Sequence, residues 1–171
     1  MQSTVGRKAP GGRTDFVMYA DVVFVTYTRS RVHDKEEFHR CLRHSVADSL
    51  SRVKATSKVT VDVFGSRELH EDGTPHYHVV LRFSKRVYWP RARLSLSVWI
   101  LVGDKRVVDT HSINIKKKRH GESVAEFLYS VQTYVAKGGD VFGNWIGGRT
   151  VLASGFGPGP ALVSGGGMGG Q

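Results

Sequence analysis

Two stretches near the middle of the chain have the residue pattern of a β-hairpin. In the first, residues 58–69, valine occupies every second position at the start, which is typical of a strand with one buried face. The second, His76 to Phe83, is more continuously apolar. An Asp72-Gly73 pair between them favours a tight turn. The pattern predicts two antiparallel strands, with a bulge possible at Gly65.

Apolar residues with helical spacing predict two helices, one from Asp34 to about Lys54 and one from Glu122 to Lys137. Asp34 is a suitable N-cap, and Gly138-Gly139 ends the second helix. The residues expected to form the two buried stripes are Phe38, Leu42, Val46 and Leu50, and then Val124, Phe127, Leu128, Val131 and Val135.

Three further strands are expected outside the hairpin. Val22 to Thr28 is β-branched and aromatic throughout, as in a central strand. Two more, residues 98–102 and 107–115, flank a Gly103-Asp104 turn. Together these elements predict an α+β fold in which a ferredoxin-like or RRM-like antiparallel sheet of about five strands is flanked by α-helices.

Composition divides the chain into three parts. Residues 1–20 are expected to form a disordered basic arm, residues 21–142 one domain, and residues 143–171 a glycine-rich flexible tail. Removal of the tail is predicted to leave the fold nearly intact, unless Trp145 and Ile146 dock on the core.

The charge balance indicates a polyanionic partner. Lys and Arg number 25 against 15 Asp and Glu, a formal net charge of +10, which favours nucleic acid first and an anionic membrane second. Cys41 is the only cysteine, so we expect no intramolecular disulfide and a reducing compartment. The start of the chain has no apolar signal-peptide core, and no apolar run is long enough to span a membrane.

His76 and His78 are the strongest candidates for chemistry. Residues two apart on a strand share a face, and the predicted turn brings Glu68 beside His76. Two imidazoles and a carboxylate can bind a divalent metal. The alternative is a pair of polar residues without a metal. A structural zinc site is disfavoured, because such sites normally have four ligands, often cysteines.

Two other features are ambiguous by themselves. Tyr134 lies at the edge of the second helix's buried stripe, next to Lys137, and by itself is best interpreted as a packing tyrosine. The basic run from Lys116 to Arg119 suits a phosphate-contacting loop, a nuclear-import signal or a solvated loop.

Three motifs in order give the chain a family resemblance: Phe24–Arg29, Arg67–His78 and Val131–Lys137. The chain resembles the replication initiator (Rep) HUH endonuclease domain of circular single-stranded DNA viruses, closest to the geminivirus and genomovirus branch. The resemblance covers Val22 to Asp140, and its second motif is the most specific. Thr28-Arg29 replaces the family's Pro-Gln, and the GxxxxGK[ST] motif of the helicase domain is absent from this sequence.

The resemblance implies rolling-circle initiation by metal-dependent nicking of single-stranded origin DNA. Tyr134 would be the nucleophile and form a 5′-phosphotyrosine, with strand joining as the reverse reaction. Lys137 would stabilise charge at the reacting tyrosine. The implied ligands of a Mg²⁺ or Mn²⁺ ion are Glu68, His76 and His78.

The expected partners follow from the same resemblance. They are single-stranded DNA or an origin stem-loop, a helicase domain or full-length Rep, and host replication proteins, in the host nucleus and away from membranes. The alternative is a catalytically inactive single-stranded nucleic-acid-binding module of RRM-like fold. Basic and aromatic residues favour contact with DNA, and the candidates are Tyr27, Arg29, Arg82, Lys116, Lys117, Lys118 and Arg119.

Overall fold

The computed structural model describes residues 14–110 and 112–147. The strands are β1 (Met18–Thr28), β2 (Val61–Leu69), β3 (Pro75–Trp89), β4 (Trp99–Val102), β5 (Lys105–Val108), β6 (Ser112–Lys117) and β7 (Val141–Gly143). The helices are α1 (Lys35–Ser51), α2 (Ala92–Ser95) and α3 (Val124–Ala136), with a 3-10 turn, η2 (Lys54–Thr56). No helix in the described ranges is both long and apolar enough to cross a membrane.

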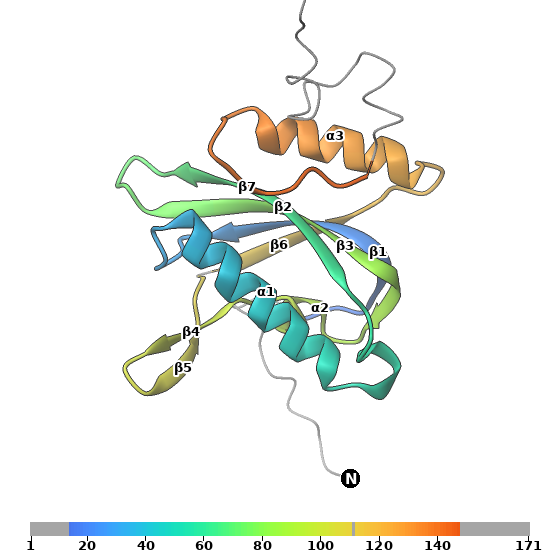
Figure 1. Ribbon diagram of the computed structural model, residues 1–171, viewed down its shortest axis with the longest axis horizontal. Coiled ribbons are helices and arrows are strands. Elements are labelled where there is room, and N and C mark those ends of the chain that lie inside the picture. Colours follow the sequence, from blue (N-terminus) through green and yellow to red (C-terminus); the bar gives the residue numbers. More distant parts are fainter. Residues whose placement is uncertain (1–13, 111, 148–171) are drawn as a thin grey trace, which may run out of the picture.

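Five of the described strands form one antiparallel sheet in the order β6-β1-β3-β2-β7. Helix α3 lies against one face of the sheet, and α1 lies against the other (Figure 1). The short strands β4 and β5 form a separate hairpin at the side of α1. The predicted α+β fold is confirmed, and the five-stranded antiparallel sheet is consistent with a ferredoxin-like layout.

Both faces of the sheet are buried, each under its own helix. On one face, Phe38 of α1 stacks on Tyr77 of β3, with ring centroids 3.7 Å apart. On the other, Val80 of β3 packs with Phe127 and Leu128 of α3. A segment buried on both faces of a sheet has few polar positions, which is why Val79–Leu81 in β3 is continuously apolar.

The helix ends follow local capping chemistry. The Asp34 carboxylate accepts hydrogen bonds from the N–H groups of Glu36 and Glu37, which confirms the predicted N-cap. Helix α1 ends at Ser51, three residues before the expected end. Helix α3 begins at Val124 because Ser123 forms a capping box with Glu126.

The β2–β3 hairpin has the predicted turn but not the bulge. Gly73 has a φ of 81°, a conformation that glycine adopts without strain. The register runs unbroken across Gly65, so the bulge prediction is wrong. Glycine is needed there because the ring of Phe142 lies on the strand, and a Cβ would come within 2.4 Å of it. The shift in register lies in β1, between Ala20 and Val22.

The expected strand over residues 107–115 is two strands in different sheets. Its first residues belong to the β4–β5 hairpin, and its last belong to β6 beside β1. Asp109 lies between them, buried, and its carboxylate accepts hydrogen bonds from the Ser30 hydroxyl and the Arg31 N–H. These hydrogen bonds hold the chain at Asp109, between the end of β5 and the start of β6. Lys116 and Lys117 are consequently on a strand rather than in a loop.

The amino-terminal boundary of the domain also differs from the prediction. Strand β1 begins at Met18, inside the segment expected to be disordered, because Met18 and Ala20 are buried in the core. Asp15 accepts hydrogen bonds from the N–H groups of Arg93 and Leu94. The last residues of the predicted arm therefore belong to the fold. Residues 1–13 lie outside the described part.

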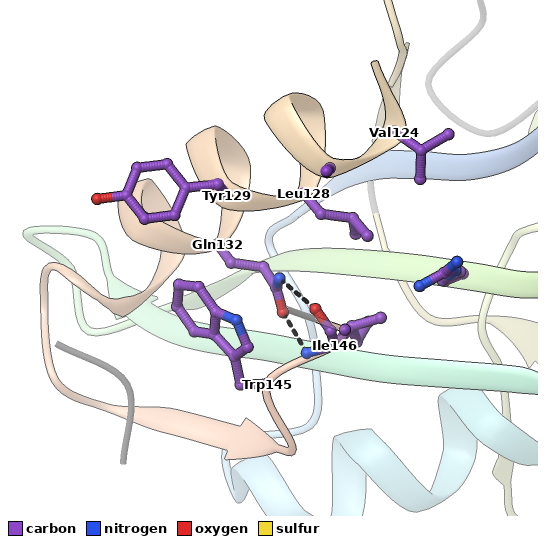
Figure 2. A pocket seen from close by; sticks show the side chains of 9 residues that line it. Val124, Leu128, Tyr129, Gln132, Trp145 and Ile146 are labelled. Carbon is purple, nitrogen blue, oxygen red and sulfur yellow. Dashed lines mark hydrogen bonds between the residues drawn. The ribbon is translucent and has the colours of Figure 1, made fainter. Parts of the chain in front are cut away.

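At the other boundary, the chain beyond Gly143 is still part of the fold. The side-chain amide of Gln132 donates to the carbonyl of Ile146 (2.9 Å) and accepts from its N–H (2.6 Å), as Figure 2 shows. Ile146 is buried, and Trp145 packs against Phe64. The predicted boundary at 143 is wrong for these residues, because a buried amide on α3 requires the backbone of Ile146. The rest of the predicted tail, residues 148–171, lies outside the described part.

Truncation experiments test this corrected boundary. A chain ending at Gly147 is expected to melt close to the temperature of the full chain. A chain ending at Gly143 loses the burial of Ile146 and leaves the Gln132 amide unpaired. Together these losses lower the free energy of unfolding by about 3 kcal/mol or more, which corresponds to a decrease in Tm of roughly 10 °C for a domain of this size. Circular dichroism melts of the two chains provide the measurement. Equal Tm values would contradict a structural role for the last residues.

Candidate metal centre and adjoining basic cleft

Three potential metal ligands converge on the β2–β3 hairpin. Oε2 of Glu68 lies 3.0 Å from Nε2 of His76 and 3.0 Å from Nε2 of His78. The two imidazole nitrogens are 2.9 Å apart. Among the described residues, these three form the cluster of His, Cys, Asp or Glu side chains close enough to bind one ion.

Strand register produces this convergence. Glu68 pairs with His76 across the antiparallel hairpin, and His78 follows on the same face of β3. Tyr77, between the histidines, points to the opposite face and is fully buried beneath α1. The alternation predicted from the sequence therefore places all three candidate ligands together.

The spacing of the three atoms suits a hexacoordinate ion. Ligands adjacent in an octahedron with bonds of about 2.1 Å lie roughly 3.0 Å apart, whereas tetrahedral ligands at that bond length lie roughly 3.4 Å apart. The observed triangle has edges of 2.9 to 3.0 Å. It matches one face of an octahedron, so the other coordination positions remain for water or substrate.

Electrostatics favours the protonation states of Glu68 and His76 that metal binding requires. Hydrogen bonds from His78 and His76 lower the pKa of the Glu68 carboxyl, which favours the carboxylate. Burial lowers the pKa of His76, and the nearby His78 adds to the effect, which favours the neutral imidazole. Metal binding needs a carboxylate and neutral imidazoles.

Each histidine has a second contact that the sequence reasoning missed. Nδ1 of His76 lies 3.1 Å from Nε2 of His70, and Nδ1 of His78 lies 3.2 Å from Oγ1 of Thr26. Strand alternation alone could have indicated His70, because it lies two residues after Glu68. Thr26 depends on the β1–β3 register, where it pairs with His78, and no local pattern contains that information.

Tyr134 of α3 lies directly beside this cluster. Its ring meets the ring of His78 edge-on, with centroids 5.5 Å apart. Phe24 contacts both rings, stacked on His78 at 5.9 Å and edge-on to Tyr134 at 6.0 Å. Tyr134 is nevertheless 57% exposed, so its hydroxyl is not committed to the core. Phe24 belongs to the first motif, but no local pattern marks it as a neighbour of the site.

A cleft of about 730 Å³ opens beside His78 along α3 and β6. Three of the predicted DNA-contacting residues line it, Lys116, Lys117 and Arg119, together with Tyr134. Its remaining lining residues are Phe24, Thr26, His78, Asn114, Glu122, Phe127, Ser130 and Val131. Positive side chains and a nucleophile candidate thus share one concave surface with one of the candidate ligands.

The remaining predicted residues lie elsewhere. Tyr27 is fully buried on the α1 side, where its hydroxyl donates to the carbonyl of Leu96. The prediction that Tyr27 contacts DNA is therefore wrong, because strand alternation turns it away from Thr26. Arg29 forms an ion pair with Asp72, next to the turn. Arg82 lines a separate pocket beneath the amino-terminal half of α3, beside Trp145.

Two further predicted residues, Lys118 and Lys137, also lie outside the lining of the cleft. Lys118 directs its ammonium group to the carbonyl of Arg119 and is not among the lining residues. Lys137 is exposed at the carboxyl end of α3, where its N–H donates to the carbonyl of Tyr134. It neighbours Tyr134 in sequence as predicted, but the described lining of the cleft does not include it.

A cluster of ion pairs connects the end of α3 to the strand that carries Glu68. Asp140 accepts from Lys35 (2.7 Å) and from the guanidinium of Arg67 (2.9 Å). The backbone carbonyl of Asp140 also accepts from the N–H of Arg67. Lys35 and Arg67 lower the pKa of the Asp140 carboxyl. The cluster fixes the chain that follows α3 against β2, one residue from a candidate ligand.

In comparisons with known proteins, no protein-family model and no curated protein matched this chain.

Replacement of the histidines tests the metal centre. Alanine at both His76 and His78 is expected to abolish Mn²⁺ binding measured by isothermal titration calorimetry, because two of three ligands are lost. The fold should persist, since neither side chain belongs to the core clusters. His44→Ala, an exposed residue of α1, is the control and should bind as the wild type does. Undiminished binding by the double variant would contradict the site.

The salt dependence of binding tests the basic cleft. Alanine at Lys116, Lys117 and Arg119 should flatten the log–log salt slope of single-stranded DNA binding by about 0.7 per lost phosphate contact, up to about 2 in all. Fluorescence anisotropy at several salt concentrations measures that slope.

The matched control for the cleft removes the same charge elsewhere. Alanine at Lys54, Lys58 and Lys105, which are exposed and outside the cleft, should change the slope little. Equal changes in both triple variants would show that net charge, rather than the cleft, determines DNA binding.

Proposed function

We propose that this chain is a metal-dependent, site-specific endonuclease and strand-joining enzyme for single-stranded DNA, with Tyr134 as its nucleophile. It would act as an initiator of rolling-circle replication, as its resemblance to the Rep domain implies. The supporting observation is the contact between Tyr134 and His78, which brings a half-exposed phenol to the edge of three converging ligand atoms.

The proposed reaction exchanges one phosphoester for another. The phenolic oxygen of Tyr134 forms a bond to phosphorus as the bond from phosphorus to the 3′ oxygen breaks. The phenol loses a proton and the departing 3′ oxygen gains one, so the products are a 5′-phosphotyrosine and a free 3′-hydroxyl. The energy of the broken ester is retained in the new one. Attack by a 3′-hydroxyl on the same phosphorus therefore rejoins the strand at the same site.

Tyrosine is a weak nucleophile while its phenol is protonated, so the site has to lower the barrier of the reaction in another way. A divalent ion held by Glu68, His76 and His78 would polarise a non-bridging phosphate oxygen and stabilise charge in the transition state. Mg²⁺ and Mn²⁺ fit the mixed oxygen and nitrogen ligands and the octahedral spacing. Phe24 stacks against His78, with ring centroids 5.9 Å apart, and would restrict the movement of that imidazole.

The cleft would hold the strand on either side of the reacting phosphate. Lys116, Lys117 and Arg119 suit the phosphates, and Asn114 offers an amide that can bond with a base or a phosphate. Lys137, three residues after Tyr134, remains a predicted source of charge stabilisation at the tyrosine.

Some of the same residues would also suit two other functions. Two histidines and a carboxylate on one face also bind iron in Fe(II) oxygenases. The phenol beside the ligands and the cations along the cleft favour a phosphate substrate instead. A catalytically inactive RRM-like module would bind nucleic acid on an open sheet face. Here a helix packs on each face, which disfavours that binding mode.

Transfer of a label to the protein tests the proposal. The DNA probe is a randomised pool of single strands with a fluorophore at the 3′ end, incubated with Mn²⁺. The wild type is expected to give a fluorescent protein band on a denaturing gel, because the 3′ fragment stays attached through its 5′ phosphate. A label at the 5′ end should not transfer. Tyr134→Phe should remove the band while Mn²⁺ binding persists, since the three ligands are unchanged.

Tyrosines outside the cleft provide the controls. Tyr88→Phe and Tyr129→Phe should retain the band, and chelation of the metal should remove it in every variant. Tyr27 and Tyr77 are unsuitable, because their buried hydroxyls donate hydrogen bonds to the backbone. A wild-type protein that binds the pool without transferring label would support the binding module. A band that survives in Tyr134→Phe would place the nucleophile elsewhere.

A further inference from the structure

Each imidazole of the candidate metal centre uses its second ring nitrogen in a separate contact. His76 Nδ1 contacts Nε2 of His70, and His78 Nδ1 contacts Oγ1 of Thr26. The two contacts come from opposite sides of β3, since His70 lies just beyond the end of β2 and Thr26 lies on β1. The chain segments on the two sides of β3 thus each supply one partner.

Metal binding would determine the tautomers of the two histidines. A neutral imidazole carries one proton and one lone pair. An ion held where both Nε2 atoms and Oε2 of Glu68 converge would use the two Nε2 lone pairs, so the proton of each ring has to be on Nδ1. Each Nδ1–H then has its own acceptor, His70 or Thr26.

We propose that His70 and Thr26 are positioning residues of the metal centre. Each accepts the Nδ1–H of one ligand imidazole and thereby holds its Nε2 lone pair and its ring plane toward the ion. The inference rests on the proposed metal-dependent function and extends it to two residues that do not touch the metal. Ligand histidines in metal sites generally donate their other N–H to such a partner.

The backbone around each partner is well placed for this role. His70 is held in the turn by two backbone hydrogen bonds, from its own N–H to Thr74 and from Gly73 to its carbonyl. Its ring meets that of His76 at 64°, with centroids 4.6 Å apart. Thr26 lies directly opposite His78 in the β1–β3 register. Side-chain substitution at either position leaves these backbone contacts in place.

Paired substitutions separate the hydrogen bond from the space that the side chain fills. His70→Leu removes the acceptor, whereas His70→Gln offers a carbonyl oxygen near the position of Nε2. Thr26→Val removes the hydroxyl and keeps the shape, whereas Thr26→Ser keeps the hydroxyl. We expect His70→Leu and Thr26→Val each to weaken Mn²⁺ binding by about 10- to 100-fold. The Gln and Ser variants should retain most of the affinity, as measured by calorimetry without DNA.

Matched controls come from the same strand and the same residue types. Thr28→Val changes a threonine two residues along β1 whose hydroxyl bonds to Ser112, and it should bind Mn²⁺ as the wild type does. His44→Leu changes an exposed histidine of α1 and should also have no effect. Melting curves of all variants verify that the fold is retained.

A spectroscopic measurement reads the tautomer directly in the protein loaded with Mg²⁺, which is diamagnetic. Nitrogen-15 chemical shifts of neutral imidazoles distinguish a protonated Nδ1 from a protonated Nε2. The wild type should show His76 and His78 protonated at Nδ1. His70→Leu should shift the tautomer balance of His76 alone, and Thr26→Val that of His78 alone. A general structural disturbance would not produce this pairwise selectivity.

The outcomes separate the positioning inference from the function on which it rests. If the wild type binds no Mn²⁺, the proposed function fails. If His76→Ala abolishes binding while His70→Leu and Thr26→Val bind as tightly as the wild type, the metal centre stands and the positioning inference is overturned. Weak binding in His70→Gln and Thr26→Ser, equal to that of the Leu and Val variants, would also overturn it.

Discussion

The register of β3 against its two neighbouring strands is the constraint on which this structure depends. It pairs Glu68 with His76 on one side and Thr26 with His78 on the other. A slip of one residue would turn both histidines toward α1 and expose Tyr77. The register is secure because the alternate residues of β3 are buried under α1 and the turn before it contains a glycine with positive φ. Both the stability of the fold and the geometry of the candidate metal centre thus depend on the register of β3.

The position of α3 is determined by a second set of interactions. Its apolar side packs on the sheet through Phe127 and Leu128, and the Gln132 amide binds the backbone of Ile146. Asp140 then ties the following chain to β2 through Arg67. Tyr134 is therefore placed against His78 by contacts made elsewhere along the helix. Its own side chain remains half exposed, as a nucleophile that must meet a DNA strand would need to be.

Charge is distributed so that the candidate centre can accept a phosphate. One carboxylate and two neutral imidazoles give the ligand set a charge of about −1, so a bound divalent ion would leave a net charge of about +1. Lys116, Lys117 and Arg119 extend this positive region along the cleft. Much of the excess positive charge of the chain lies elsewhere on the surface, which is why the cleft requires a control variant of equal charge.

Local pattern was sufficient to predict the α+β class, the Asp34 cap, the hairpin, and the meeting of Glu68, His76 and His78, because turn chemistry and strand alternation act over short distances. Local pattern was not sufficient for Tyr27, because alternation separates Tyr27 from Thr26 but only tertiary packing shows that α1 covers the face to which Tyr27 points. Nor could it place Thr26 against His78, or the backbone of Ile146 against Gln132. Those contacts join residues far apart in the sequence, and only the packing of strands and helices determines which distant residues meet.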